Sequence, residues 1–145
     1  MIGQMDVMMR LTLSVVLGGL VGFERQMHKR GAGLRTHILV SMGSCLIMLT
    51  SLYVFDIYSS KVAMDPTRIA AGVITGIGFL GAGAILRDTE GVKGLTTAAS
   101  LWVVAGVGLA VGCGFYTGAM FTTALALVTL FFLRYAETAI FGNQE

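Results

Sequence analysis

The side chains that could bind a divalent cation are five carboxylates scattered along the chain. They are Glu24, Asp56, Asp65, Asp88 and Glu90. Magnesium requires octahedral oxygen coordination and usually keeps several of its waters. A dedicated path would show several carboxylates together, or a ring of them from an oligomer. None of the five lies in the middle of an apolar segment. The sequence therefore leaves the metal undetermined, with Glu24 and Asp65 as the candidate ligands.

The histidines and cysteines form no catalytic or zinc-binding pattern. His28 and His37 have no cysteine or carboxylate partner at the spacing of a zinc site. No Ser-His-Asp or Cys-His arrangement can be argued. Cys45 and Cys113 both fall in apolar runs, where cysteine packs as a small apolar side chain. We therefore expect a protein that is not an enzyme and that holds no cofactor.

Residues 76 to 81 read GIGFLG and match G-x-G-x-x-G, the phosphate-binding fingerprint of dinucleotide folds. That fingerprint needs a strand before it, a helix after it, and an acidic residue about 20 positions further on. Here the glycines lie inside an apolar run, and no acidic residue occurs between Leu95 and Glu137. The match is therefore interpreted as accidental.

Helical spacing gives these glycines another purpose. At 100° per residue, the small residues of this segment fall within one broad arc and the bulky ones on the other. The small arc consists of Ala71, Gly72, Thr75, Gly76, Gly78, Ala82 and Gly83. Small side chains let membrane helices approach closely. We expect this segment to be the central helix, packed on its small arc. Gly81 lies off the arc and points to an alternative, a helix locally unwound at a transport site.

Three G-x-x-x-G pairs lie on three different segments. They are Gly18 with Gly22, Gly72 with Gly76, and Gly108 with Gly112. Together with Gly78, Gly81 and Gly83, these glycines are the expected helix-packing positions. Close packing within the chain is the ordinary interpretation, and a dimer face for one pair is the alternative.

Polar residues form a stripe on the segment that follows the first basic loop. His37, Ser41, Ser44, Met48 and Ser51 recur at helical spacing, so they should face protein or water instead of lipid. We favour hydrogen bonds between helices over a substrate path.

The ends of the segments carry further polar signals. Glu24 and Arg25 end the first segment, and Arg35 and His37 begin the second, so these four should meet near the cytoplasmic surface. Asp65 before Pro66 is typical of a helix start, with the aspartate as N-cap and the proline at the first helical position.

The composition predicts a polytopic membrane protein. Of the 145 residues 55% are apolar and only 12% are charged, about half the usual charged share of a soluble domain, and the mean hydropathy is +0.81. The net charge of +2 is too small to indicate nucleic-acid binding. Five apolar segments, near 7–23, 36–57, 69–86, 97–111 and 117–133, approach the length that a bilayer requires. The fold class is therefore all-α, a single-domain bundle of five transmembrane helices over residues 1–145.

The basic residues predict the orientation, because they concentrate on cytoplasmic loops. Seven of the ten fall on one side if all five segments span: Arg25, Lys29, Arg30, Arg35, Arg87, Lys93 and Arg134. Only Arg10, Lys61 and Arg68 fall on the other. We expect the N-terminus outside and the C-terminus in the cytoplasm. A re-entrant third segment is the rival topology, and it would need a protein-lined or wet cavity.

The chain resembles the transmembrane domain of the MgtC/SapB family of bacterial membrane proteins. Four stretches carry the resemblance: GFERQ at 22–26, AGLRTHILVSMGS at 32–44, DPTRIAAGVITGIGFLGAGAIL at 65–86 and GLTTAASLWVVAGVGLAVGCGFY at 94–116. They cover almost half the chain in order. The combination of GIGFLGAG with GLTTAASLW is specific.

The resemblance implies a five-span protein of the bacterial inner membrane, linked to magnesium homeostasis, growth at low magnesium and, in pathogens, virulence. It also implies a set of candidate functional polar residues: Glu24, Arg25, Arg35, Thr36, His37, Asp65, Arg68, Thr96, Thr97, Ser100 and Trp102. Two departures stand out. Many members carry a soluble cytoplasmic domain after the fifth helix, which we expect to be absent because the chain stops at Glu145. Many also have a larger polar residue, often glutamine, in place of Gly72.

Two functions follow from these observations. The first is a non-enzymatic regulator that acts on other membrane proteins through a glycine-lined face, itself a homo-oligomer with a dimer favoured. The alternative is a transporter or channel for a cation such as magnesium, or for a small solute. Its path would use the small arc of 69–86 and the serine stripe.

Overall fold

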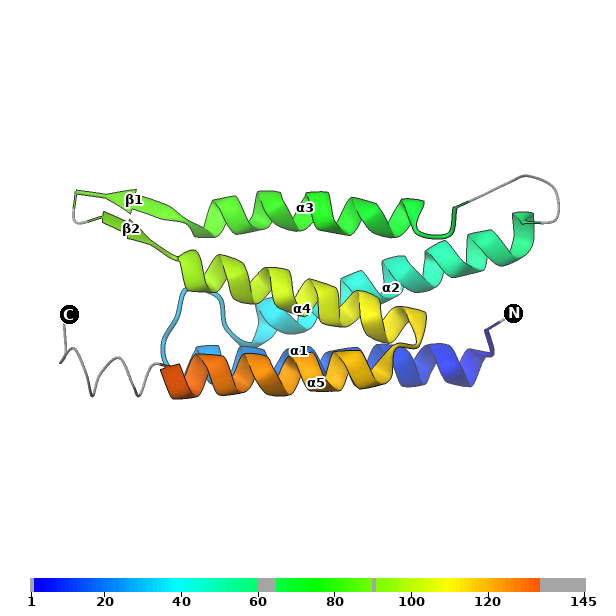
Figure 1. The fold of residues 1–145 in the computed structure, drawn as a ribbon, viewed down its shortest axis with the longest axis horizontal. Helices are drawn as coiled ribbons and strands as arrows, with labels where there is room; N and C mark the ends of the chain where they lie inside the picture. Colours follow the sequence, from blue (N-terminus) through cyan, green and yellow to red (C-terminus); the bar gives the residue numbers. More distant parts are fainter. Residues whose placement is uncertain (1, 60–64, 90, 134–145) are drawn as a thin grey trace.

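The computed structural model describes residues 2–59, 65–89 and 91–133, which form five α-helices and one short hairpin (Figure 1). The helices are α1 (Gln4–Met27), α2 (Leu34–Tyr58), α3 (Arg68–Ala84), α4 (Leu95–Cys113) and α5 (Tyr116–Val128), which a short π-helix, η1 (Thr129–Leu133), extends. Strands β1 (Leu86–Asp88) and β2 (Gly91–Lys93) pair antiparallel between α3 and α4. The mostly helical fold class is confirmed, with the hairpin as its exception.

Consecutive helices run in alternating directions along the long axis of the molecule (Figure 1). The α1–α2 connection, the hairpin and the end of η1 therefore lie at one end, and the start of α1 lies at the other. We call the first the hairpin end. Within the described residues, α1, α2 and α4 are long and apolar enough to cross a membrane, while α3 and the helical stretch Tyr116–Phe132 are shorter apolar helices. Five spans and their orientation remain predictions.

Helix α2 lies between α1 and α4 and is held close to both by glycines. An added Cβ at Gly18 or Gly22 of α1 would lie 2.6 Å and 2.8 Å from the Cβ atoms of Ser41 and His37. On the other side, an added Cβ at Gly108 would lie 2.1 Å from the Ser41 carbonyl oxygen. An added Cβ at Gly112 would lie 2.7 Å from the Cβ of Met48. These two glycine pairs let both neighbours approach the α2 backbone.

The central helix is α4, not α3, so the expectation for residues 69–86 is wrong. Helix α4 contacts each of the other four helices, whereas α3 packs on α4 and α2 at the edge of the bundle. Two groups of buried side chains flank α4. One contains Leu17, Cys45, Leu49, Val107, Val111 and Ala119, and the other Ala32, Val73, Ile77, Leu101 and Ala105.

The small arc of α3 does not pack within the chain either. The buried positions of α3 are Ala70, Val73, Ile77 and Gly81, while all seven residues of the small arc are exposed. An added Cβ at Gly72, Gly76, Gly78 or Gly83 would meet nothing within 4 Å, and one at Gly81 would meet only the Ala98 side chain, at 3.7 Å. Val73 and Ile77 give α4 more dispersion contact than glycines could, which accounts for the side that α3 turns inward. The helix is continuous, with no break at Gly81.

Gly94 forms the junction between β2 and α4. Its φ of +92° is in the left-handed region, and an added Cβ would lie 2.0 Å from the Ala84 carbonyl oxygen. Only glycine fits both conditions. The hairpin itself was not predicted, because strands of three residues are too short to show an alternating pattern.

The start of α3 differs from the predicted cap. The N-cap residue is Thr67, and α3 begins at Arg68. The Asp65 carboxylate instead accepts hydrogen bonds from the hydroxyl and backbone N–H of Thr67, at 2.7 Å and 2.8 Å. These bonds favour the charged form and hold the pKa of Asp65 below its ordinary value. The Ser51 hydroxyl donates to the Pro66 carbonyl oxygen, which ties this turn to α2.

Candidate functional site

A buried polar cluster lies near the hairpin end of the bundle, where α1, α2 and α4 meet. Its five members are Glu24, Arg25, His37, Thr97 and Ser100, all of which are less than 10% exposed. Glu24 and Arg25 come from the last turns of α1, His37 from the first turn of α2, and Thr97 and Ser100 from the first turns of α4. The predicted meeting of the α1 and α2 ends therefore holds for three of its four residues.

His37 is fully buried, and both of its ring nitrogens have partners. Nδ1 lies 2.9 Å from the Gly33 carbonyl oxygen, and Nε2 lies 3.0 Å from the Ser100 hydroxyl oxygen. A carbonyl oxygen only accepts, so Nδ1 carries a proton. Gly22 lets α1 approach the start of α2 at His37, because any Cβ there would collide with the Cβ of His37.

The Ser100 hydroxyl has one proton and two acceptors. Its oxygen lies 2.8 Å from the Thr97 carbonyl oxygen as well as 3.0 Å from His37 Nε2. If the imidazole is neutral, Nε2 is an acceptor and competes with that carbonyl for the proton. If the imidazole is doubly protonated, Nε2 donates to Ser100 and Ser100 donates to Thr97. The Ser100 hydroxyl therefore has an acceptor for its proton in either protonation state of the imidazole.

Arg25 connects the cluster to the start of α4. Its Nη2 donates to the Thr97 hydroxyl oxygen at 3.4 Å, and its Nη1 lies 3.9 Å from a carboxylate oxygen of Glu24. The guanidinium is therefore a buried cation beside the N-terminal turn of a helix. Unpaired N–H groups already make that turn partly positive.

The Glu24 carboxylate is buried and has ionic neighbours but little hydrogen bonding. His28 Nδ1 lies 2.9 Å from Oε1, and it also lies 2.8 Å from the backbone oxygen of Glu24. One Nδ1 proton serves one acceptor, and the backbone contact has the better geometry. Neither carboxylate oxygen has a hydrogen bond to the described residues. Glu24 is therefore the buried acceptor in this cluster with capacity left for a further donor or a cation.

The other candidate residues lie elsewhere. Arg35 and Thr36 are exposed at the start of α2, and Trp102 is 54% exposed on the outer side of α4. Asp65 and Arg68 lie at the opposite end of the bundle, at the start of α3 (Figure 1). Thr96 is exposed beside the cluster. Glu24 and Asp65 are therefore too far apart to share a metal ion, and the described residues contain no group of three His, Cys, Asp or Glu that could hold one.

The polar stripe of α2 faces protein. His37, Ser41, Ser44, Met48 and Ser51 are all buried. Hydrogen bonds to other elements account for the burial of only some of these side chains. His37 and Ser51 bond to residues of other elements, but the Ser41 hydroxyl has no partner among the described residues. Close contact with the two glycine pairs accounts for the rest.

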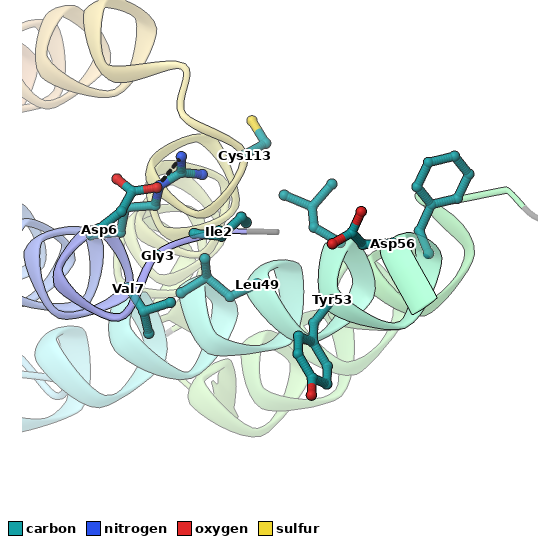
Figure 2. A pocket seen from close by; sticks show the side chains of 11 residues that line it. Ile2, Gly3, Asp6, Val7, Leu49, Tyr53, Asp56 and Cys113 are labelled. Carbon is teal, nitrogen blue, oxygen red and sulfur yellow. Dashed lines mark ion pairs between the residues drawn. The ribbon is translucent and has the colours of Figure 1, made fainter. Parts of the chain in front are cut away.

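A second polar group, which sequence reasoning missed, lies at the opposite end. Arg10 donates to the Gly112 carbonyl oxygen at 2.8 Å and pairs with Asp6 at 2.7 Å, and Tyr116 donates to Asp6 at 3.4 Å. A cavity of about 540 Å³ borders this group, and Figure 2 shows Asp6 and Asp56 on its opposite sides. The i, i+4 spacing of Asp6 and Arg10 was the signal that could have found the ion pair.

Comparison with known proteins gives a consistent family. The MgtC family profile matches residues 11–139. Escherichia coli K12 has a relative named "Putative magnesium transporter YhiD", 46% identical over 86% of this chain and 59% of its own length. Protein SapB of Bacillus subtilis is 39% identical over 93% of this chain and 60% of its own. Protein MgtC of Salmonella typhimurium is 41% identical over 91% and 54%. The chain thus spans little more than half the length of these relatives. No solved structure matches it.

Proposed function

The chain belongs to the MgtC family, and on that premise we propose that it is a non-enzymatic membrane protein of magnesium homeostasis that acts by binding another membrane protein. The binding surface is the small arc of α3. The link to magnesium comes from the name of a relative that this chain matches over little more than half of that relative's length.

The observation that carries this proposal is that no described residue covers the small arc of α3, a surface of glycine and other small residues. The G-x-x-x-G pairs of α1 and α4 pack against α2, whereas an added Cβ at Gly72 or Gly76 would meet none of the described residues within 4 Å. Lipid tails gain little from a glycine surface, whereas a second helix gains close van der Waals contact. The occupant we favour is therefore a transmembrane helix with a small-residue face of its own. A second copy of this chain is the other occupant that the surface could take.

The setting that we propose for this function is the bacterial inner membrane, with five spans. The hairpin end would face the cytoplasm. The supporting observation is that six basic residues lie at that one end: Arg25 and Arg35 at the adjoining ends of α1 and α2, Lys29 and Arg30 in their connection, and Arg87 and Lys93 in the hairpin.

Co-purification with a matched glycine pair tests the binding surface. Gly76→Leu places a large side chain on the small arc, and Gly106→Leu makes the same change on α4, where an added Cβ also meets nothing. Both chains should fold. Membrane proteins that co-purify with the parent chain from detergent should be lost from Gly76→Leu and kept by Gly106→Leu. Equal recovery with both variants would contradict the proposal.

A cation path is the second candidate, and the buried Glu24 carboxylate favours it. A buried carboxylate that accepts no hydrogen bond from the described residues, near the end of an apolar helix, has the chemistry of a transient cation ligand. Magnesium flux into proteoliposomes should then fall at least tenfold in Glu24→Gln. If the parent chain shows no flux beside a working magnesium channel, this candidate fails.

A further inference from the structure

A basic cavity opens at the hairpin end and extends to the polar cluster. Its volume is about 760 Å³. Three separate stretches of the chain form its walls: the end of α1 with the α1–α2 connection, the end of α3 with the hairpin and the start of α4, and the start of η1. Its lining residues include Arg25 and Thr97, two members of the polar cluster. This cavity has no role in the function proposed above, because that function uses the uncharged small arc of α3.

The cavity has the charge of an anion site. Four cationic side chains line it, Arg25, Lys29, Arg30 and Lys93, and none of the described residues that line it is acidic. The nearest carboxylates that pair with these cations are Glu24, 3.9 Å from Arg25, and Asp88, 3.4 Å from Lys93. Lys29 and Arg30 also line the cavity, and neither forms an ion pair with the described carboxylates.

The backbone adds to this charge. Leu95, Thr96 and Thr97 form the first turn of α4, and all three line the cavity. The N–H groups of a first helical turn have no partner within the helix, and the N-cap residue, Gly94, has no side chain to cap them. Arg25 is 95% buried beside the same turn, so a buried cation and the positive end of a helix lie together. The first turn of α4 therefore adds partial positive charge to the wall of the cavity, beside the Arg25–Glu24 pair.

The cavity also has an apolar wall. Leu86 and Val92 of the hairpin, Leu95 of α4 and Leu130 of η1 line it beside the cations. A cavity that combines cations with an apolar wall, at the end of a bundle of membrane helices, suits a phosphate group that carries an acyl chain. Basic pockets at such positions bind the headgroups of anionic lipids.

We propose that this cavity binds a phosphate group, supplied by the headgroup of an anionic phospholipid such as phosphatidylglycerol. The phosphate oxygens would take the first-turn N–H groups of α4 and the charges of Lys29, Arg30 and Lys93. The acyl chain would lie along the apolar wall. Free inorganic phosphate has the same recognition chemistry and is the other source.

Native mass spectrometry of the full chain in detergent tests this inference, with titrations of phosphatidylglycerol, phosphatidylcholine and inorganic phosphate. The test variant is the triple change Lys29→Gln, Arg30→Gln and Lys93→Gln, which leaves the buried cluster intact. The matched control, Arg35→Gln, Arg68→Gln and Arg87→Gln, removes the same charge from exposed residues that do not line the cavity. Each surface charge near a phosphate contributes enough that the test variant should bind phosphatidylglycerol roughly a hundredfold more weakly.

The outcomes separate the sources. The parent chain and the control should prefer phosphatidylglycerol over phosphatidylcholine, and the preference should weaken with added salt. Displacement of the lipid by millimolar inorganic phosphate would move the assignment to the free ion. Equal binding of both lipids by the parent chain, or equal loss in the test and control variants, would overturn the proposal. If the test variant does not fold, the lipid preference and salt dependence of the parent chain still decide. The α3 surface contributes nothing to this binding, so Gly76→Leu should bind lipid normally.

Discussion

At the scale of single residues, the central fact is that polar side chains are buried where three helices meet. His37 and Ser100 form a hydrogen bond with each other and further hydrogen bonds with the carbonyl oxygens of Gly33 and Thr97. The sequence placed Glu24, Arg25 and His37 together from their positions at the ends of segments. It could not place Thr97 and Ser100 beside them, because the direction of α4 around α2 depends on packing. The family motif alone singled these two out.

Removing the Ser100 hydroxyl should destabilise the bundle. In Ser100→Ala, His37 Nε2 loses its partner in a buried site, at a cost of about 0.5–2 kcal/mol. Thr12→Ala is the control, because Thr12 is exposed and bonds only within α1. Thermal unfolding in detergent measures both variants. Equal melting temperatures for Ser100→Ala and the parent chain would show that this bond contributes nothing.

Asp65 predicts a pH dependence at the start of α3. Its pKa in the folded chain is below the ordinary value of about 4, because Thr67 donates two hydrogen bonds to the carboxylate. Its stabilisation is fully present above that ordinary value and is lost as the pH falls through the lower pKa of the folded state. Asp65→Asn keeps an acceptor oxygen but cannot titrate. We expect a small fall in melting temperature between pH 6 and pH 3 that is reduced in this variant. The same fall in both chains would assign the effect to other groups.

At the scale of elements, the glycine pairs of α1 and α4 pack against α2, whereas Gly72 and Gly76 of α3 contact none of the described residues. The G-x-x-x-G spacing is the same in both cases, so it does not separate the two. Hydropathy cannot identify the inward side of α3, since both of its arcs are apolar enough for lipid and one is bulky enough for a core. The sequence predicted the number, order and approximate bounds of the helices. It assigned the centre of the bundle to α3 instead of α4, because hydropathy does not show which helix has the most neighbours.

Single glycine replacements should separate the two roles. In Gly108→Ala the new Cβ would collide with the Ser41 carbonyl oxygen, so α2 and α4 must move apart, at a cost of roughly 1–3 kcal/mol. In Gly72→Ala the new Cβ meets nothing, and the better helix propensity of alanine should stabilise α3 by up to about 1 kcal/mol. Thermal unfolding of purified variants compares them. A Gly72→Ala chain less stable than Gly108→Ala would show that α3 is packed on the other arc.

At the scale of the whole molecule, alternation of helix direction gathers the basic loops at one end (Figure 1). The charge pattern predicted this arrangement, because seven of the ten basic residues fall on one side if the five apolar segments alternate in direction. The cavity at the hairpin end could not be predicted, because its walls come from three stretches of the chain that no local pattern connects.

The proposed orientation can be checked with single cysteines. Lys29→Cys lies at the hairpin end and Ser59→Cys at the other, each in a chain with Cys45→Ala and Cys113→Ser. A membrane-impermeant maleimide should label position 59 in spheroplasts and position 29 only after lysis. Reversed labelling would place the hairpin end outside, and the proposed setting would be wrong.

The most direct test of the central claim is photo-crosslinking from the small arc in living cells. A photoreactive amino acid replaces Gly76 in the full chain, and the same amino acid at Gly106 serves as the control. If α3 binds another membrane protein, illumination should give an adduct of this chain with one such protein from position 76 and none from position 106. Adducts with a second copy alone, or with no protein, would contradict that claim.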